Sequence, residues 1–163
     1  YTPKPRGFFK VDLPVKEYKT IDIDCGFSFK KPIYSILKET NQDCLYDLHF
    51  PAQEGVLHIT YLPLQDNLLE HIEQSRNLAY KHDVIEDAIS ESIYVDDMHK
   101  VYGLLYDYEG ATATSTQFYL TDSINHFVRG ALYFNFEVTD SIEPINKFLH
   151  EDVRYIIESF EWK

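Results

Sequence analysis

Basic residues are scarce in this 163-residue chain. It contains 15 Lys and Arg against 27 Asp and Glu, which gives a formal net charge of −12. Binding to nucleic-acid phosphates requires clustered Lys and Arg, and so does adsorption to anionic lipid headgroups. The charge balance therefore argues against nucleic acid as a partner and against direct binding to an anionic lipid surface.

Long apolar runs and the common catalytic motifs are also missing. No apolar segment reaches the roughly 18 residues of a membrane-spanning helix. The sequence has no Gly-rich phosphate loop, no GxSxG, no HExxH, no CxxC and no EF-hand spacing. We therefore predict no cofactor, no metal site and no catalytic residue, and we do not expect an enzyme.

One short segment does bring triad residue types together. Asp122, Ser123 and His126 lie within five positions of one another. Members of a catalytic triad converge from separate segments with a precise geometry, so closeness in sequence is a weak indication. We interpret this segment as a polar turn.

Cysteine is limited to Cys25 and Cys44. In an oxidising compartment the two thiols would close a short loop, worth roughly 3 kcal/mol by chain-entropy arguments. The other interpretation is two buried free thiols, and the cysteine count alone does not decide between them.

The length and composition fit one globular domain. Apolar residues make up 44% of the chain and aromatic residues 15%, which is enough for a sizeable core. Pro3 and Pro5 predict an extended tether over residues 1–7, followed by a globular domain over residues 8–163. The chain opens at Tyr1 without a methionine, and we expect that a targeting segment preceded it.

Hydrophobic periodicity predicts mostly strands with two helices. Strands are expected at residues 8–13, 18–23, 26–29, 45–50, 56–62, 84–95, 101–108, 113–121 and 127–136, while residues 33–37 are ambiguous. Helices are expected from Asn67 to about Lys81 and from Asp140 to the C-terminus, each beginning with a capping-box spacing. Because the late strands are apolar on both faces, the sheet needs a layer on each side. The predicted fold is α/β of the α+β type, a three-layer α/β/α sandwich with a mostly antiparallel sheet.

The corner between the last two predicted strands is the expected binding surface. It carries more hydrogen-bonding groups than a simple turn requires. The residues proposed to bind are Tyr119, Thr121, Asp122, Ser123, His126 and Arg129. In the alternative interpretation Asp122 caps local amides and pairs with Arg129 to brace the turn.

Several segments resemble a known family. They are residues 1–8 (YTPKPRGF), 101–106 (VYGLLY), 117–134 (QFYLTDSINHFVRGALYF) and 157–163 (IESFEWK). The chain resembles the gliding motility lipoprotein GldD family of Bacteroidetes over essentially its whole length. The order of elements is also similar to that of PsbP- and Mog1-type domains, which serve as accessory proteins of larger complexes.

The resemblance implies a non-enzymatic envelope protein associated with gliding motility and type IX secretion. It would be anchored to a membrane by a lipid upstream of Tyr1, would face the periplasm and would have other envelope proteins as partners. The oxidising compartment so implied favours a disulfide between Cys25 and Cys44. The alternative is a small-ligand-binding or hydrolytic domain that uses the Thr121–Arg129 corner.

Overall fold

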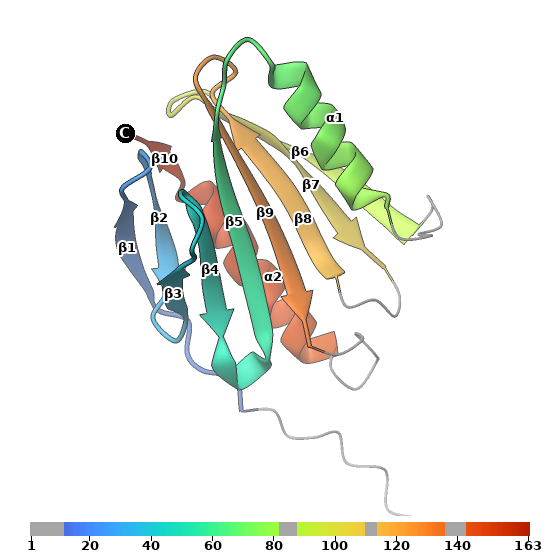
Figure 1. Cartoon of the computed structure of the whole chain (residues 1–163). Coiled ribbons are helices and arrows are strands. Elements are labelled where there is room, and N and C mark those ends of the chain that lie inside the picture. The colour runs from blue at the N-terminus through green and yellow to red at the C-terminus, as the bar shows by residue number, and fades with distance from the viewer. Residues whose placement is uncertain (1–11, 82–87, 110–113, 136–142) are drawn as a thin grey trace, which may run out of the picture.

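The structure, a computed structural model, describes residues 12–81, 88–109, 114–135 and 143–163 (Figure 1). Most of the described chain is in strands. In chain order the elements are β1 (Tyr18–Ile23), β2 (Phe27–Pro32), β3 (Ile36–Glu39), β4 (Leu45–Phe50), the 3-10 turn η1 (Pro51–Gln53), β5 (Gly55–Pro63), α1 (Leu68–Ala79), β6 (Ile89–Asp96), β7 (Val101–Tyr108), β8 (Thr114–Thr121), β9 (His126–Phe134), α2 (Glu143–Glu158) and β10 (Glu161–Trp162).

The strands form two sheets. The larger has seven strands in the order β3-β4-β5-β9-β8-β7-β6, and the smaller has three in the order β1-β2-β10. Every strand pairing among the described residues is antiparallel. The predicted α+β class with a mostly antiparallel sheet is therefore confirmed.

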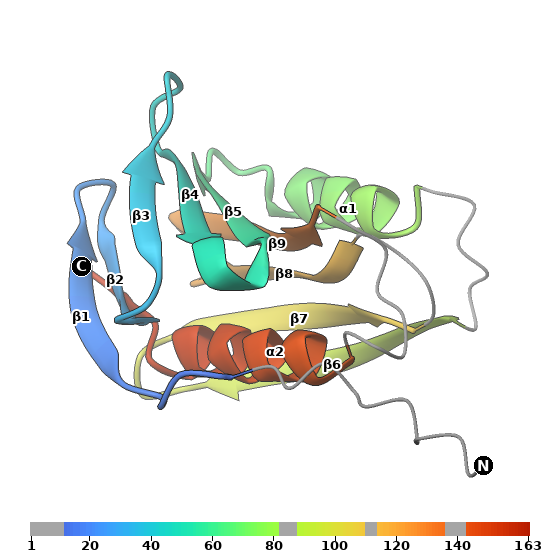
Figure 2. The same ribbon diagram turned by 90° about the horizontal axis from the view of Figure 1, so that it is seen from below.

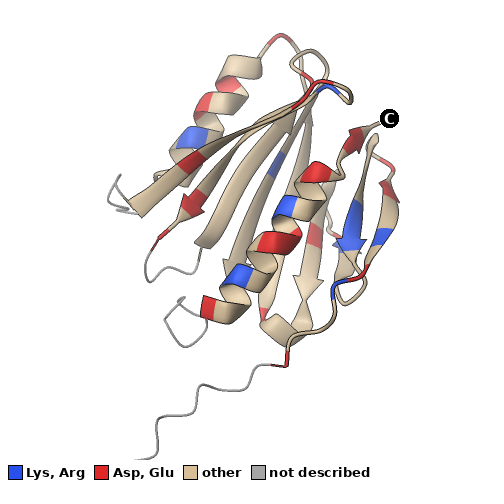
Figure 3. Ribbon diagram, turned by 180° about the vertical axis from the view of Figure 1, so that it is seen from behind, with Lys and Arg blue, Asp and Glu red and all other residues tan. Residues whose placement is uncertain are grey.

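The two helices lie on opposite faces of the larger sheet. α1 is in front of it in Figure 1, and α2 is in front when the molecule is seen from behind in Figure 3. The smaller sheet lies beside α2 at the β3 side of the larger sheet (Figure 2), and its residues share one core with α2. The face covered by α2 is thus covered by a helix and a small sheet together, and the strict α/β/α layering stays a prediction.

α2 buries one continuous stripe against this core. Its buried apolar side chains, with that of the residue just after it, are Phe148, Leu149, Val153, Ile156, Ile157 and Phe160. They recur at intervals of three and four, which places them on one face of a helix. Acidic and basic residues alternate along α2, whereas the middle strands of the larger sheet carry few charges (Figure 3).

Some expected boundaries differ from the structure. The expected strand over 8–13 lies partly outside the described residues, and residues 12–13 are not in a strand. The capping box at Asn67 is wrong, because its side-chain oxygen accepts a hydrogen bond from the amide of Gln65 and not from the first turn of α1. A turn is also expected at residues 53–55, with Gly55 supplying the backbone freedom, but the left-handed residue there is Glu54, with φ of 53°. The expected tether, the second capping box and residues 84–87 lie outside the described residues.

Cys25 and Cys44 form a disulfide, as expected, with their Cα atoms 5.8 Å apart. Cys25 lies in the turn between β1 and β2, and Cys44 precedes β4. The bond therefore joins the smaller sheet to the larger one.

Loss of this disulfide is expected to destabilise the fold. In a Cys25→Ser, Cys44→Ser double variant the free energy of unfolding should fall by about 3 kcal/mol, because the unfolded chain regains the freedom of the loop that the bond closes. Chemical denaturation measures the change, and thiol titration of the unfolded, non-reduced wild type should find no free thiol. Two free thiols in the oxidised protein would contradict the bond.

Candidate functional site

Four connections lie at one end of the larger sheet. One of them, residues 40–44, joins β3 to β4. The other three form what we call the loop end: residues 64–67 between β5 and α1, residues 97–100 between β6 and β7, and residues 122–125 between β8 and β9. Figure 1 shows all three at the upper end, while residues 12–17 lie at the opposite end. The loop end contains the turn of the corner proposed from the sequence.

Asp122 organises the β8–β9 turn. Its Oδ1 accepts hydrogen bonds from the amides of Ile124, Asn125 and His126 at 3.0, 2.8 and 2.8 Å. Burial alone would raise the pKa of the Asp122 carboxyl, but these amide hydrogen bonds outweigh it and hold that pKa below its usual range. Thr121 braces the same turn, since its hydroxyl donates to the carbonyl of His126 at 2.6 Å.

Replacing Asp122 by alanine should lower the free energy of unfolding by about 1–3 kcal/mol, because the turn loses its charged acceptor. A carboxyl with a depressed pKa stabilises the fold above its unfolded pKa, near 3.9, and this contribution is lost as pH falls through the folded value. The difference between wild type and variant should therefore shrink in acid. Urea unfolding at pH 7 and pH 3 tests this, with the exposed Asp43→Ala as control; a difference independent of pH would contradict it.

The side chain of His126 lies on one face of the larger sheet, where two aromatic residues contact it. Its Nδ1 lies 2.7 Å from the hydroxyl of Tyr61, and its ring stacks on Trp162 with centroids 5.0 Å apart. The indole of Trp162 also donates to the carbonyl of Lys100 at 3.0 Å. His126 therefore joins β9 of the larger sheet to β10 of the smaller one.

Arg129 and Tyr119 lie on the other face, towards α1. The Arg129 guanidinium donates to the hydroxyl of Ser75 at 3.1 Å and to the carbonyl of His71 at 3.4 Å. Burial lowers the pKa of this guanidinium. The ring of Tyr119 stacks on Phe127 at 5.3 Å. Among the described residues Arg129 forms no ion pair with Asp122, so that part of the bracing interpretation is not found.

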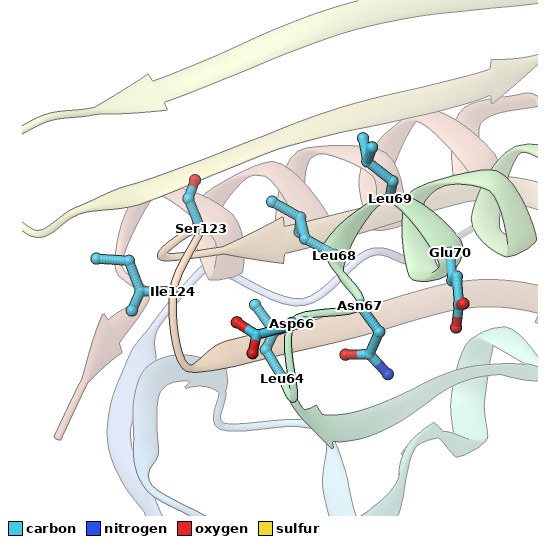
Figure 4. Close-up of a pocket in the computed structure, with 8 residues that line it drawn as sticks. All are labelled: Leu64, Asp66, Asn67, Leu68, Leu69, Glu70, Ser123 and Ile124. Atoms are coloured by element: carbon cyan, nitrogen blue, oxygen red, sulfur yellow. The ribbon is translucent and has the colours of Figure 1, made fainter.

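The structure thus brings Thr121, Asp122 and Ser123 together in the turn and separates His126 from Arg129. Beside the turn is a groove of about 530 Å³ (Figure 4). Its lining combines apolar and polar side chains of the turn and of the start of α1, namely Leu64, Asp66, Asn67, Leu68, Leu69, Glu70, Ser123 and Ile124. Leu69 and Ile124 are 77% and 71% exposed. The sequence interpretation missed this groove, because its two halves are more than fifty residues apart.

A serine, a histidine and an aspartate do converge elsewhere. The hydroxyl of Ser115 contacts Nε2 of His150 and the amide oxygen of Asn146, and Nδ1 of His150 lies 3.5 Å from the carboxylate of Asp107. A nucleophile must be reached by its substrate, but Ser115 is only 1% exposed. We interpret the cluster as a polar contact that holds α2 on β7 and β8.

His150 should make the fold sensitive to mild acid. Burial lowers its pKa, and the Asp107 carboxylate offsets this only in part. Below the ordinary histidine pKa of about 6.5 the unfolded chain binds a proton that the folded chain does not, so stability is full above that pH and falls as pH decreases. A His150→Gln variant should lose stability less steeply from pH 7 to pH 5 in thermal unfolding. Equal slopes for wild type and variant would contradict this assignment.

Comparison with known proteins identifies the family. The model of the gliding motility lipoprotein GldD family matches residues 1–162. The chain belongs to this family. A comparison with curated proteins found no match. The resemblance stated from the sequence is confirmed, and with it the association with gliding motility and the lipoprotein character of the family.

None of the described helices is long and apolar enough to cross a membrane. Among the same residues no group of three or more His, Cys, Asp or Glu side chains is placed to hold a metal ion.

Proposed function

We propose that this protein is a non-enzymatic, lipid-anchored accessory component of the gliding motility and type IX secretion machinery, that it faces the periplasm, and that it docks other envelope proteins through its loop end. The observation that carries the proposal is the family match over nearly the whole chain. The positions of two segments at opposite ends of the molecule support it. Residues 12–17, which follow the N-terminal segment, lie at one end and the loop end lies at the other (Figure 1).

This arrangement separates attachment from docking. A lipid at the N-terminus would place the membrane near residues 12–17, and the loop end would point away from it. There the groove presents Leu69 and Ile124 to solvent beside the carboxylates of Asp66 and Glu70 and the hydroxyl of Ser123. Exposed apolar side chains rimmed by polar groups are typical of protein interfaces. Of the six residues proposed from the sequence, Ser123 contributes directly to this surface, while Asp122 and Thr121 fix the turn that carries it.

The test replaces the exposed apolar side chains by lysine in the full, lipidated protein. A Leu69→Lys, Ile124→Lys double variant should keep the melting temperature and lose co-purification with the motility and secretion proteins after cross-linking in cells. Val15→Lys is the matched control, because Val15 is 80% exposed and belongs to the segment 12–17 at the opposite end (Figure 1). Unchanged co-purification by the folded double variant would remove the loop end as the docking surface.

A small-ligand site is the second candidate, since the volume of the groove falls within the usual range of ligand pockets, about 300–1,000 Å³. Hydrolysis has less support. Ser123 lies in the groove, but none of the described residues that line it is a histidine. A saturable rise in melting temperature with a small envelope metabolite, abolished by Leu69→Lys, would favour this candidate over protein docking.

A further inference from the structure

The outer edge of the larger sheet at β6 is a long strand with exposed apolar side chains. β6 pairs with β7 over all eight of its residues without a bulge, and in the described part of the chain no strand pairs with its other edge. Ile93 and Val95 are 81% and 58% exposed. Natural proteins usually protect such edges with lysine, proline, a bulge or a short strand. β6 has no lysine, proline or bulge and is eight residues long, and its only charged residues are the acidic Glu91 and Asp96.

The opposite edge shows the contrast. β3 has only four residues, and two of them are Lys38 and Glu39. A short strand with charged side chains resists pairing with another chain. The openness of β6 is therefore a local property and not a general feature of this sheet.

The backbone groups that face outward can be assigned. The amide of Glu109 donates to the carbonyl of Ala88 at 2.7 Å, which makes these two residues a hydrogen-bonded pair at the start of the ladder. In an antiparallel ladder hydrogen-bonded and non-hydrogen-bonded pairs alternate. It follows that the N–H and C=O groups of Glu91, Ile93 and Val95 point away from β7, towards the free edge.

We propose that β6 is a docking edge for an extended, basic segment of another envelope protein, which adds a strand to the larger sheet. Outward backbone groups supply the hydrogen bonds, and Ile93 and Val95 provide apolar contacts on one face, as in other cases of strand addition. The charge of the partner follows from that of the chain. β6 carries Glu91 and Asp96 and no Lys or Arg. Because Glu91 lies 3.7 Å from Arg76 and Asp96 pairs with His99, the charge that favours a basic partner is mainly the net charge of −12 of the whole chain.

A second copy of this chain fits the edge less well. Antiparallel pairing of β6 with β6 would reverse the long axis of the second molecule, so that residues 12–17 of the two copies would lie at opposite ends (Figure 1). Two copies anchored in the same orientation on one membrane would not present antiparallel β6 strands to each other. They would also bring together two chains of the same negative charge. The exclusion of a second copy rests on the proposed function; the open edge itself does not.

The test uses a capped peptide of sequence KVTVTKT as the probe and the amide NMR spectrum of the purified chain as the readout. At millimolar peptide we expect saturable shifts and slower hydrogen exchange at Glu91, Ile93 and Val95. Three changes should each weaken binding at least tenfold: Val→Pro at the centre of the peptide, glutamate in place of both peptide lysines, and Ile93→Lys in the protein. Ile36→Lys on β3 is the matched control, because Ile36 is also an exposed edge residue at 50%.

Several outcomes would overturn the proposal. They are the absence of saturable shifts on β6, equal binding by the acidic peptide or by Ile93→Lys, and loss of binding in Ile36→Lys. Concentration-dependent shifts on β6 without peptide would identify a second copy as the occupant. The Leu69→Lys, Ile124→Lys variant should bind the peptide like wild type, so failure at the loop end and failure at β6 are distinguishable.

Discussion

Replacement of Asp152 by alanine is expected to lower the free energy of unfolding by about 3–5 kcal/mol, because it removes one partner of a buried charge pair. Asp152 lies on α2 and is completely buried. Its Oδ1 accepts hydrogen bonds from Nζ of Lys16 at 2.8 Å and from the hydroxyl of Tyr18 at 2.7 Å. Its Oδ2 accepts a third from the hydroxyl of Tyr34. The variant would leave an ammonium and two hydroxyl groups without this acceptor.

The cluster also shows how the N-terminal segment is attached. Nζ of Lys16 donates to the carbonyl of Phe148 at 2.9 Å and lies 3.6 Å from the centre of the Phe148 ring. Burial, and then the hydrogen bonds to Asp152, raise the pKa of Tyr18 and of Tyr34, so both hydroxyl groups stay protonated donors. α2 therefore holds the segment that leads towards the proposed anchor.

Glu151→Ala is the matched control for this prediction. Glu151 also lies within 3.8 Å of Nζ of Lys16, but its side chain is 55% exposed, and exposed pairs contribute little. Urea unfolding should show a large loss for Asp152→Ala and a change of less than about 1 kcal/mol for Glu151→Ala. Equal losses of unfolding free energy in the two variants would mean that burial does not decide how much a carboxylate near Lys16 stabilises the fold. Asp152→Asn, which keeps an acceptor, should lie between the two.

Strand and helix positions were largely predictable because periodicity records which side chains are buried. The strands at residues 45–50 and 101–108 have the expected bounds. The apolar stripe that helical spacing predicts for α2 is also largely found. Ile145 is only partly buried and Phe148 is buried in addition, while the other expected residues are buried, namely Leu149, Val153, Ile156, Ile157 and Phe160. The cysteine count alone left a disulfide and two free thiols equally open. The resemblance to a family of an oxidising compartment favoured the disulfide. Strand order was not predictable, because it depends on contacts between segments far apart in the sequence.

The candidate site was predicted less well, and two signals in the sequence could have improved the interpretation. His126 and Arg129 are three residues apart in one strand, so their side chains must point to opposite faces. The two side chains therefore cannot belong to one binding surface on a single face of the sheet. Asp152 falls within the apolar stripe of α2, between Leu149 and Ile156, and an acidic residue at a buried helical position predicts a charged or hydroxyl partner. The groove and the open edge of β6 gave no comparable signal, since both depend on which segments lie side by side.

Removal of the chain from residue 140 onward is expected to abolish folding. This deletion takes away α2 and β10, including six large apolar side chains that are each at most 7% exposed, from Phe148 to Phe160. Burial of each contributes about 1.5–3 kcal/mol, and together these contributions are comparable with the whole net stability of a domain, about 5–15 kcal/mol. The deletion would also expose the core face that α2 shares with the smaller sheet. Residues 1–139 should therefore be insoluble or lack a cooperative thermal transition.

A single substitution tests the same dependence without removing the partners of Lys16. Leu149→Ala should lower the free energy of unfolding by about 2–5 kcal/mol, because the side chain is fully buried and its removal leaves a cavity against the sheet. Lys147→Ala, an exposed position two residues earlier in the same helix, should change it by less than about 0.5 kcal/mol. A cooperative transition of the 1–139 chain near the wild-type midpoint would show that the two sheets and α1 form a stable unit alone. In that case α2 would be a separate element bound to the rest of the domain through the N-terminal segment. The Asp152 cluster would then hold α2 in place without contributing to the stability of the sheets.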